Sequence, residues 1–200
     1  MIDENVLFVL EHRIAVAQVA KHLLNQWIEV PEGEVSLGER VFHVGAFKIS
    51  KSLVTVSQWS KVMGPENLLS RRPVTGVSFV ETISFVTRLN MCREEAGRIS
   101  IPTEAQLMLA RQEGVVGPPH KYSEICYTQY RDFNDMGGHH FIDNIPTDET
   151  CEVVIRDSHE RFPLPFRPNN DSIGFRLVLV DYEEKRDIND LLEMFKDELI

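Results

Sequence analysis

Apolar residues recur at helical spacing near the beginning of the chain. From Asn5 to Gln26 they follow one another at three- and four-residue steps, which is the stripe of an amphipathic helix: Val6, Leu10, Ile14, Ala17, Ala20, Leu23, Leu24 and, just beyond, Trp27. A turn at Pro31-Glu32-Gly33 follows. Three short runs rich in apolar and β-branched residues then predict antiparallel strands: Val35–Leu37, Val41–Val44 and Ala46–Ile49.

Three helix starts in the middle of the chain share one capping device. In each, a hydroxyl residue is followed three positions later by Glu or Gln, as in a capping box: Thr55 with Gln58, Ser78 with Glu81, and Thr103 with Gln106. The hydroxyl accepts the N3 amide, while the Glu or Gln side chain accepts the N-cap amide. We expect the second helix to end near Gly97 and the third near Gly114, because glycine is favoured just past a helix end.

The second half of the chain is less periodic. From Val115 to Pro168 it mixes prolines, glycines, adjacent histidines and aromatic residues, which predicts a long loop-rich region. Gly174 to Val180 predicts a closing strand. Asp187 is expected to cap a last helix that docks on its own domain through Ile188, Leu191, Leu192, Phe195 and Leu199. The apolar faces of the capped helices and the closing strand place five side chains in the core: Trp59, Phe85, Leu89, Leu107 and Phe175.

Charge and cysteine content narrow the classes of function. The 200-residue chain is 42% apolar and carries a formal net charge of −10, and its Lys and Arg residues are scattered. Because such a chain repels phosphate backbones, we expect no nucleic-acid partner and favour a basic protein surface. Three widely spaced cysteines predict free thiols, and the first apolar run is broken by Glu11-His12-Arg13. We therefore expect a cytoplasmic protein with no signal peptide and no membrane-spanning segment.

The centre of the loop-rich region holds the candidate metal ligands. Carboxylate, amide and imidazole groups lie close together in the sequence, at Asp132, Asn134, Asp135 and His139. The spacing departs from an EF-hand because Met136 occupies a ligand position, so an Asx-rich turn is the alternative. Adjacent side chains of an extended segment point to opposite sides, so at most one of His139 and His140 reaches a given metal. The identity of any metal stays open.

Six ordered motifs resemble the formylglycine-generating-enzyme, or sulfatase-modifying-factor, family. Residues 27–38, WIEVPEGEVSLG, are similar to the family's opening "IPGGTFxMG", and residues 47–59, FKISKSLVTVSQW, resemble "FxIxKxEVTxxQW". Four more follow in the family's order, resembling "PVxGVSW", "LPTEAEWE", "LYDMxGN" and "GFR": PVTGVSF at 73–79, IPTEAQL at 101–107, FNDMGGH at 133–139 and IGFR at 173–176. The resemblance covers residues 27–180.

This resemblance implies a fold and a departure from the family's chemistry. The implied fold is α+β, the loop-rich C-type lectin-like fold of the formylglycine-generating type, with a small antiparallel sheet and flanking helices. The enzymes bind copper through two close cysteines that precede the final "GFR", and thiolates suit Cu(I). The corresponding segment here, Arg156 to Arg176, contains no cysteine. We therefore expect no formylglycine-generating activity and no cofactor, apart from a structural calcium ion of the kind that family members often hold.

Taken together, these features predict one compact unit: a helix at residues 1–26, the family-like domain at 27–180 and a helix at 181–200. We interpret it as a non-catalytic binding module, a pseudoenzyme that recognises a protein or small ligand through loops 115–170. The expected ligand-binding residues are aromatic or imidazole side chains: Tyr122, Tyr127, Tyr130, His140 and Phe141.

Two other functions stay open. One is a metal-dependent oxidoreductase, with non-heme iron or copper, that uses His139, His140 or a cysteine in a rebuilt pocket. The other is an immunity or accessory partner of a basic effector, which the acidity supports. The oligomeric state is not predicted by these patterns.

Overall fold

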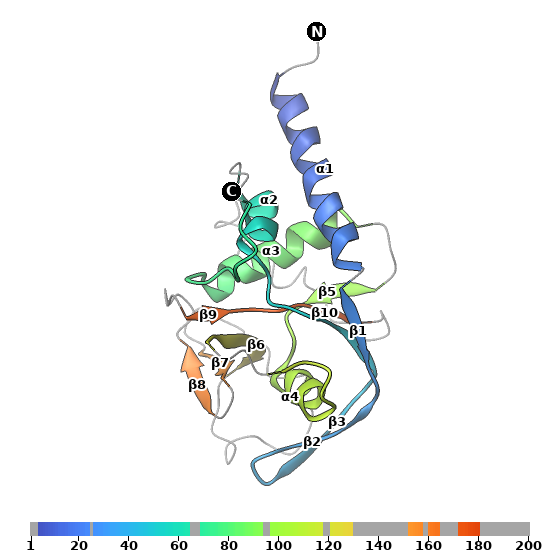
Figure 1. Cartoon of the computed structure of the whole chain (residues 1–200), viewed down its shortest axis with the longest axis vertical. Helices are drawn as coiled ribbons and strands as arrows, with labels where there is room; N and C mark the ends of the chain where they lie inside the picture. Colours follow the sequence, from blue (N-terminus) through green and yellow to red (C-terminus); the bar gives the residue numbers. More distant parts are fainter. Residues whose placement is uncertain are drawn as a thin grey trace.

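The computed structural model describes residues 4–24, 26–64, 69–93, 97–117, 121–129, 152–157, 160–164 and 172–180. In these residues the chain is mixed α+β, as the sequence predicts (Figure 1). The helices are α1 (Glu4–Leu24), α2 (Val56–Met63), α3 (Phe79–Met91) and α4 (Glu104–Gln112). The first strands are β1 (Trp27–Val30), β2 (Gly33–Leu37), β3 (Arg40–Val44), β4 (Phe47–Ser50) and β5 (Arg98–Ser100). The later strands are β6 (Ser123–Gln129), β7 (Val153–Arg156), β8 (Arg161–Leu164), β9 (Ile173–Gly174) and β10 (Val178–Val180).

The described strands form three small sheets rather than the one that the sequence predicts. The first has the order β1-β4-β10-β5 with antiparallel neighbours, and β2 and β3 form an antiparallel hairpin. The third has the order β8-β7-β6-β9, in which β6 and β9 run parallel. In Figure 1, helices α1 to α3 lie on one side of β10, whereas α4 and the β2–β3 hairpin lie on the other.

Two apolar clusters fill these two sides, and several strands contribute to both. Along β6, Ile125 belongs to the cluster that includes α1, α2 and α3, while Cys126 belongs to the cluster around α4. Along β7, Val153 and Ile155 join the first cluster and Val154 joins the second. Successive side chains of a strand point to opposite faces, so one strand serves both cores.

Helix α1 confirms the predicted helix, but its buried face matches the predicted stripe only in part, at Ala20. Val16, Val19 and Ala20 are buried in the first cluster, whereas Leu10 and Ile14 of the predicted stripe are exposed, Ile14 to 58%. The helix carries apolar residues around more than half of its circumference, so the pattern does not select the face that packs. Figure 1 shows its first turns extending beyond the other elements. No described helix has both the length and the apolarity needed to cross a membrane.

All three predicted capping boxes are present. The hydroxyls of Thr55, Ser78 and Thr103 each accept the N3 backbone N–H at 3.2 Å. In return the N3 side chains accept the N-cap N–H groups at 2.8, 2.7 and 2.9 Å. Each box therefore satisfies two backbone donors that the helix itself leaves unpaired.

One of the two predicted helix ends is wrong. Helix α4 ends as expected, with Gly114 at a φ of 66° directly after the C-cap Glu113. Helix α3 ends at Met91, well before Gly97. The Asn90 side chain explains the earlier end, because it donates to the Ile99 carbonyl at 2.8 Å and accepts the Ile99 N–H at 2.9 Å. This amide ties the helix end to β5.

Within the predicted loop-rich region, much of the part that the structure describes is strand. Residues 123–129, 153–156 and 161–164 form β6, β7 and β8, so the prediction of loops across 115–168 is wrong at these positions. The strands were missed because β6 and β7 are buried on both faces and so lack an alternating pattern, and because β8 contains Pro163, a residue that disfavours strands. The closing strand is also divided, into β9 and β10, with Phe175 to Leu177 between them. The helix expected at 187–199 lies outside the described residues.

Four of the five predicted core residues are fully buried. Phe85, Leu89, Leu107 and Phe175 have no exposed surface. Trp59 is half-buried at the edge of the first cluster, where its ring stacks on Phe85 with centroids 5.4 Å apart. The core prediction is therefore confirmed for four residues and only partly for Trp59.

Candidate functional site

A network of buried charges lies where α4, β6 and the segment after β9 meet. Glu124, on β6, has no exposed surface, and its Oε1 accepts from Arg111 Nη2 at 3.0 Å and from Arg176 Nη2 at 3.1 Å. Its Oε2 accepts from Arg176 Nε. Arg176 thus binds Glu124 with two N–H groups, which is the geometry that a guanidinium and a carboxylate favour. Two arginines share one carboxylate.

The outer nitrogens of these arginines extend the network to other strands. Arg176 Nη1 donates to the carbonyls of Ser50 at 3.0 Å and Lys51 at 3.3 Å, at the end of β4. Arg111 Nη1 donates to the carbonyl of Asp157, just after β7. Helix α4, the end of β4 and the residue after β7 are therefore linked to Glu124 through one guanidinium each, which fixes its position.

A second buried ion pair joins α4 to β7. Arg156 Nε lies 2.8 Å from Oε1 of Glu104, a residue with no exposed surface. The N–H group itself is not aimed for a hydrogen bond, so the contact is an ion pair of close approach. Two further contacts join the start of α4 to β6: Glu104 N donates to Thr128 Oγ1 at 3.0 Å, and Tyr127 N donates to the Pro102 carbonyl at 2.8 Å.

These contacts fix the two strands from which a long connection emerges. Gln129, the last residue of β6, is paired with Val153, the first residue of β7. The connection between them is residues 130–152, of which 130–151 lie outside the described residues, but its two ends are held side by side. We call β6, β7 and the buried charges of Glu104, Arg111, Glu124, Arg156 and Arg176 the strand base.

Cys126 lies inside this base and is fully buried. Burial raises the pKa of its thiol well above the ordinary value, and the carboxylates of Glu104 and Glu124 raise the pKa further. The guanidinium groups of Arg111 and Arg156 act in the opposite direction without reversing the shift. Since the thiolate is the nucleophile, a thiol kept protonated and buried is inert. The burial of Cys126 therefore disfavours it as the cysteine of a rebuilt pocket, whereas Cys151 lies outside the described residues.

The Cys126 pKa predicts a loss of stability in alkali. The unfolded chain releases the thiol proton near pH 9.0, whereas the folded chain retains it. The free energy of unfolding therefore falls by up to about 1.4 kcal/mol per pH unit above that pH, and is unaffected below it. Urea unfolding under reducing conditions, from about pH 7 to about pH 10, measures this slope. Cys126→Ala should have a shallower alkaline slope, and an identical slope would contradict the assignment.

The structure describes two of the five residues predicted to bind a ligand, and it assigns them different roles. Tyr127 lies on β6, packs against the first apolar cluster and stacks on Phe79 with ring centroids 5.9 Å apart. Tyr127 therefore lies on a strand rather than in a loop, and its half-buried ring packs against the core. Tyr122 lies directly before β6 and is half-exposed. Tyr130, His140 and Phe141 lie outside the described residues.

The candidate metal ligands also lie outside the described residues: Asp132, Asn134, Asp135 and His139. Within the described ranges, no group of three or more His, Cys, Asp or Glu side chains is placed to hold a metal ion. His43, the histidine of β3, is exposed.

The buried charges were not predicted as a site, although the sequence contains a signal for them. Glu124 stands next to Ile125 and Cys126, and Arg176 stands between Phe175 and Leu177. A charge inside a buried apolar run requires a partner of opposite sign, because an unpaired buried charge costs several kcal/mol. One acidic and one basic residue of this kind therefore indicate a buried pair before the fold is known.

Comparison with known proteins provides evidence on the fold. No family model matches the sequence, and no curated protein is detectably similar to it. Among solved structures, Treponema denticola variable protein 1 superposes with a TM-score of 0.60 at 14% identity, covering 77% of this chain and 94% of that one. CarF superposes with a TM-score of 0.54 at 14% identity, covering 78% and 98% of the two chains. At this identity the similarity is one of fold, and we conclude that the chain shares its α+β fold with these two proteins.

Proposed function

We propose that this chain is a non-catalytic binding module that recognises a protein or a small ligand through residues 115–170. One observation carries the proposal: the strand base holds the two ends of residues 130–152 side by side, through the Gln129–Val153 pair. Long connections anchored on rigid strands are typical recognition elements. A fixed base also lowers the entropy that is lost when such a connection binds its ligand.

The scaffold that we propose is the C-type lectin-like fold of the formylglycine-generating type. Residues of two motifs that carry the resemblance lie together in or beside the strand base: Thr103 and Glu104 of one, and Phe175 and Arg176 of the other. Shared motifs that meet at one buried network support a common scaffold. The fold shared with the T. denticola variable protein is compatible with it.

The absence of catalysis is the second part of the proposal. The segment from Arg156 to Arg176, where the family's enzymes carry a cysteine pair, has none. The buried thiol of Cys126 stays protonated at neutral pH, because burial raises its pKa. Both observations favour binding over thiol or copper–thiolate chemistry, and no cofactor is part of the proposal.

The proposed recognition residues are now Tyr122, Tyr130, His140 and Phe141. Tyr127 is left out because its ring packs against the first apolar cluster and stacks on Phe79. Acidic neighbours in the sequence would steer a basic partner toward this surface: Asp132, Asp135, Asp143, Asp148 and Glu149. This steering weakens as salt screens charges beyond about 8–10 Å.

Alanine substitution tests the assignment of the recognition residues. With a partner captured from the host, the variant Tyr130→Ala/His140→Ala/Phe141→Ala is expected to bind at least about tenfold more weakly, since aromatic anchors contribute about 2 kcal/mol or more. Its melting temperature should stay nearly unchanged. Tyr127→Ala serves as the contrast, because it should lower the melting temperature through lost core packing. A triple variant that binds normally, or one that unfolds, would contradict the proposal.

A further inference from the structure

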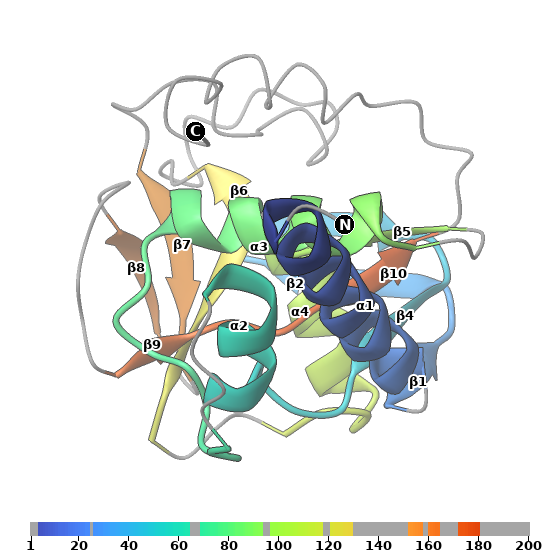
Figure 2. The same ribbon diagram turned by 90° about the horizontal axis from the view of Figure 1, so that it is seen from above.

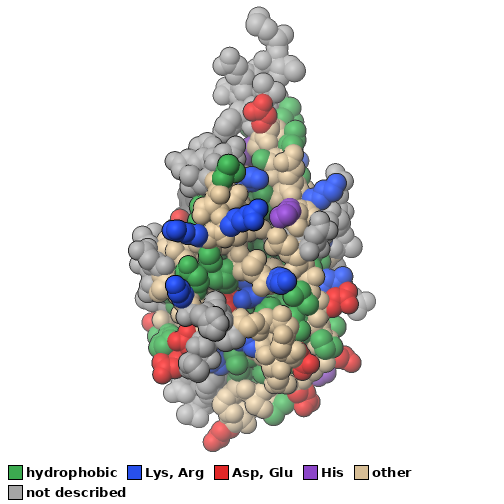
Figure 3. Space-filling view, in the orientation of Figure 1, with side chains coloured by type: hydrophobic (Ala, Val, Ile, Leu, Met, Phe, Trp, Pro, Cys, Tyr) green, Lys and Arg blue, Asp and Glu red, His purple; other side chains and the backbone are tan. Residues whose placement is uncertain are grey.

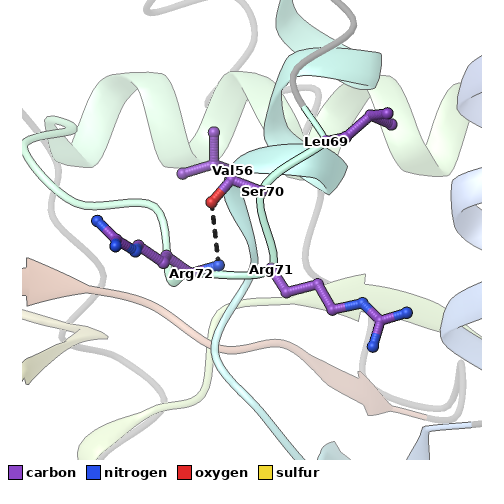
Figure 4. Close-up of a pocket in the computed structure, with 5 residues that line it drawn as sticks. All are labelled: Val56, Leu69, Ser70, Arg71 and Arg72. Carbon is purple, nitrogen blue, oxygen red and sulfur yellow. Dashed lines mark hydrogen bonds between the residues drawn. The ribbon is translucent and has the colours of Figure 1, made fainter.

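A separate surface feature lies beside the first turn of α2. Val56, Leu69, Ser70, Arg71 and Arg72 line an open hollow of about 790 Å³. Figure 4 shows Leu69 and Arg71 extending to one side of the chain and Arg72 to the other, with Val56 and Ser70 between them. The hollow is open to solvent along its length, so it fits an extended segment better than an enclosed small molecule.

The segment that carries these side chains is fixed by backbone hydrogen bonds. Val56 N donates to the Arg72 carbonyl and Ser57 N donates to the Ser70 carbonyl, both at 2.9 Å. Arg72 N donates to Ser70 Oγ at 3.3 Å, and Val74 N donates to the Val54 carbonyl at 2.8 Å. The first N–H groups of α2 are thereby satisfied by the chain itself. The backbone that presents the two arginines is pre-organised for binding.

Leu69, on this segment, is unusually exposed for an apolar side chain. Leu69 is 85% exposed, more than any other large apolar residue described. Arg71 and Arg72 are both exposed, and no described carboxylate pairs with either guanidinium. An exposed apolar side chain, followed on a fixed backbone by two cations that no described carboxylate pairs, is a combination that a binding partner would complete.

The part of the sequence that surrounds the hollow is basic, although the whole chain is acidic. The sequence from Ile49 to Val80 carries four basic residues (Lys51, Lys61, Arg71 and Arg72) against one acidic residue, Glu66, although the chain has a net charge of −10. On the face shown in Figure 3, Lys and Arg side chains gather over the helical half, and most Asp and Glu side chains lie over the other half. The hollow therefore lies in a locally basic region.

We propose that this hollow binds an acidic peptide segment of a partner protein that inserts one apolar side chain beside Leu69. Carboxylates of the segment pair with Arg71 and Arg72, whose guanidinium groups bind carboxylates with two parallel N–H groups. A peptide is favoured over a nucleic acid, because two arginines on a strongly acidic chain neutralise few phosphates. Leu69 adds an apolar contact that suits a peptide side chain.

This surface differs from the proposed recognition connection. In Figure 2, α2 lies on one side of α3, and the end of β6, where residues 130–152 begin, lies on the other. The two surfaces are therefore able to bind different partners. A variant that loses binding at one surface can therefore still be tested for binding at the other.

Fluorescence anisotropy with defined probes tests the inference on the full chain. The probes are a labelled peptide that combines glutamates and leucines, its Glu→Gln analogue, its Leu→Ser analogue, and single-stranded DNA of equal length. We expect the Glu/Leu peptide to bind best and its affinity to fall with added salt. Arg71→Glu/Arg72→Glu should weaken binding by about five- to tenfold, and Leu69→Ser by about fivefold.

A matched variant separates this site from general charge effects. Arg40→Glu/Lys121→Glu makes the same change in net charge at positions outside the hollow, and should leave binding within about twofold of the wild-type chain. Leu69, Arg71 and Arg72 are exposed, so their substitution should not change the melting temperature. Equal loss in the matched variant, preference for DNA, or no binding of the Glu/Leu peptide would each overturn the inference.

Discussion

Replacing Glu124 by alanine is expected to lower the free energy of unfolding by about 3–5 kcal/mol, because it leaves buried cations without their counter-charge. Arg111 and Arg176 both donate to this carboxylate, and their side chains are only 8% and 4% exposed. Neither guanidinium reaches water easily once Glu124 is removed. Chemical denaturation of the wild-type chain and the variant, evaluated with a common slope, measures the difference.

An exposed ion pair provides the control for this prediction. Glu29 pairs with Lys48 at 3.3 Å on the surface of the first sheet, and the two side chains are 81% and 47% exposed. Glu29→Ala should change the free energy of unfolding by less than about 1 kcal/mol, as surface pairs usually do. If Glu124→Ala costs no more than Glu29→Ala, the buried network does not hold the strand base together.

Phe85→Ala is expected to cost about 3–5 kcal/mol of unfolding free energy, the usual range for a large-to-small change in a core. Phe85 has no exposed surface and belongs to a cluster of three rings with Trp59 and Phe175. It stacks on Trp59 and meets Phe175 edge-on with centroids 5.6 Å apart. Removal of its ring takes away contacts with α2 and with the segment that leads into β10. Thermal or urea unfolding measures the effect.

The same helix supplies the matched control. Met91, at the end of α3, is 74% exposed, so Met91→Ala should change stability by less than about 0.5 kcal/mol. A loss of less than about 1 kcal/mol for Phe85→Ala would mean that α3 is not packed through this face.

Local signals in the sequence predicted the helical part of the fold well. The capping boxes at Thr55, Ser78 and Thr103 depend only on residues three apart, so no knowledge of the tertiary structure was needed. Gly114 similarly marked the end of α4, because its positive φ is a local property. The end of α3 was missed, since it depends on a contact between Asn90 and Ile99 across a turn.

The strands of the second half could not be predicted in the same way. β6 lies between two apolar clusters, so Ile125 and Cys126 are both buried and no polar face alternates with an apolar one. Glu124 lowers the apparent hydrophobicity of the strand, although its charge is paired in the fold. Tyr127 was predicted to lie in a loop because this strand shows no alternating pattern.

The candidate site was predicted only in part. Its location, near residues 115–170, followed from aromatic residues in an aperiodic stretch. The strand base that supports it depends on partners far apart in the sequence, such as Glu124 and Arg176, and became visible only in the fold.

The most direct test of the binding proposal removes the connection and keeps its base. Because Gln129 and Val153 are paired, residues 130–152 can be replaced by a two-residue Asn-Gly turn that closes β6 and β7 as a hairpin. Calorimetric titration of the captured partner into the wild-type chain and this variant measures the affinity, and circular dichroism monitors the fold. We predict that the variant keeps its folded signal and loses detectable binding. A folded variant that binds its partner as tightly as the wild-type chain would contradict the proposal.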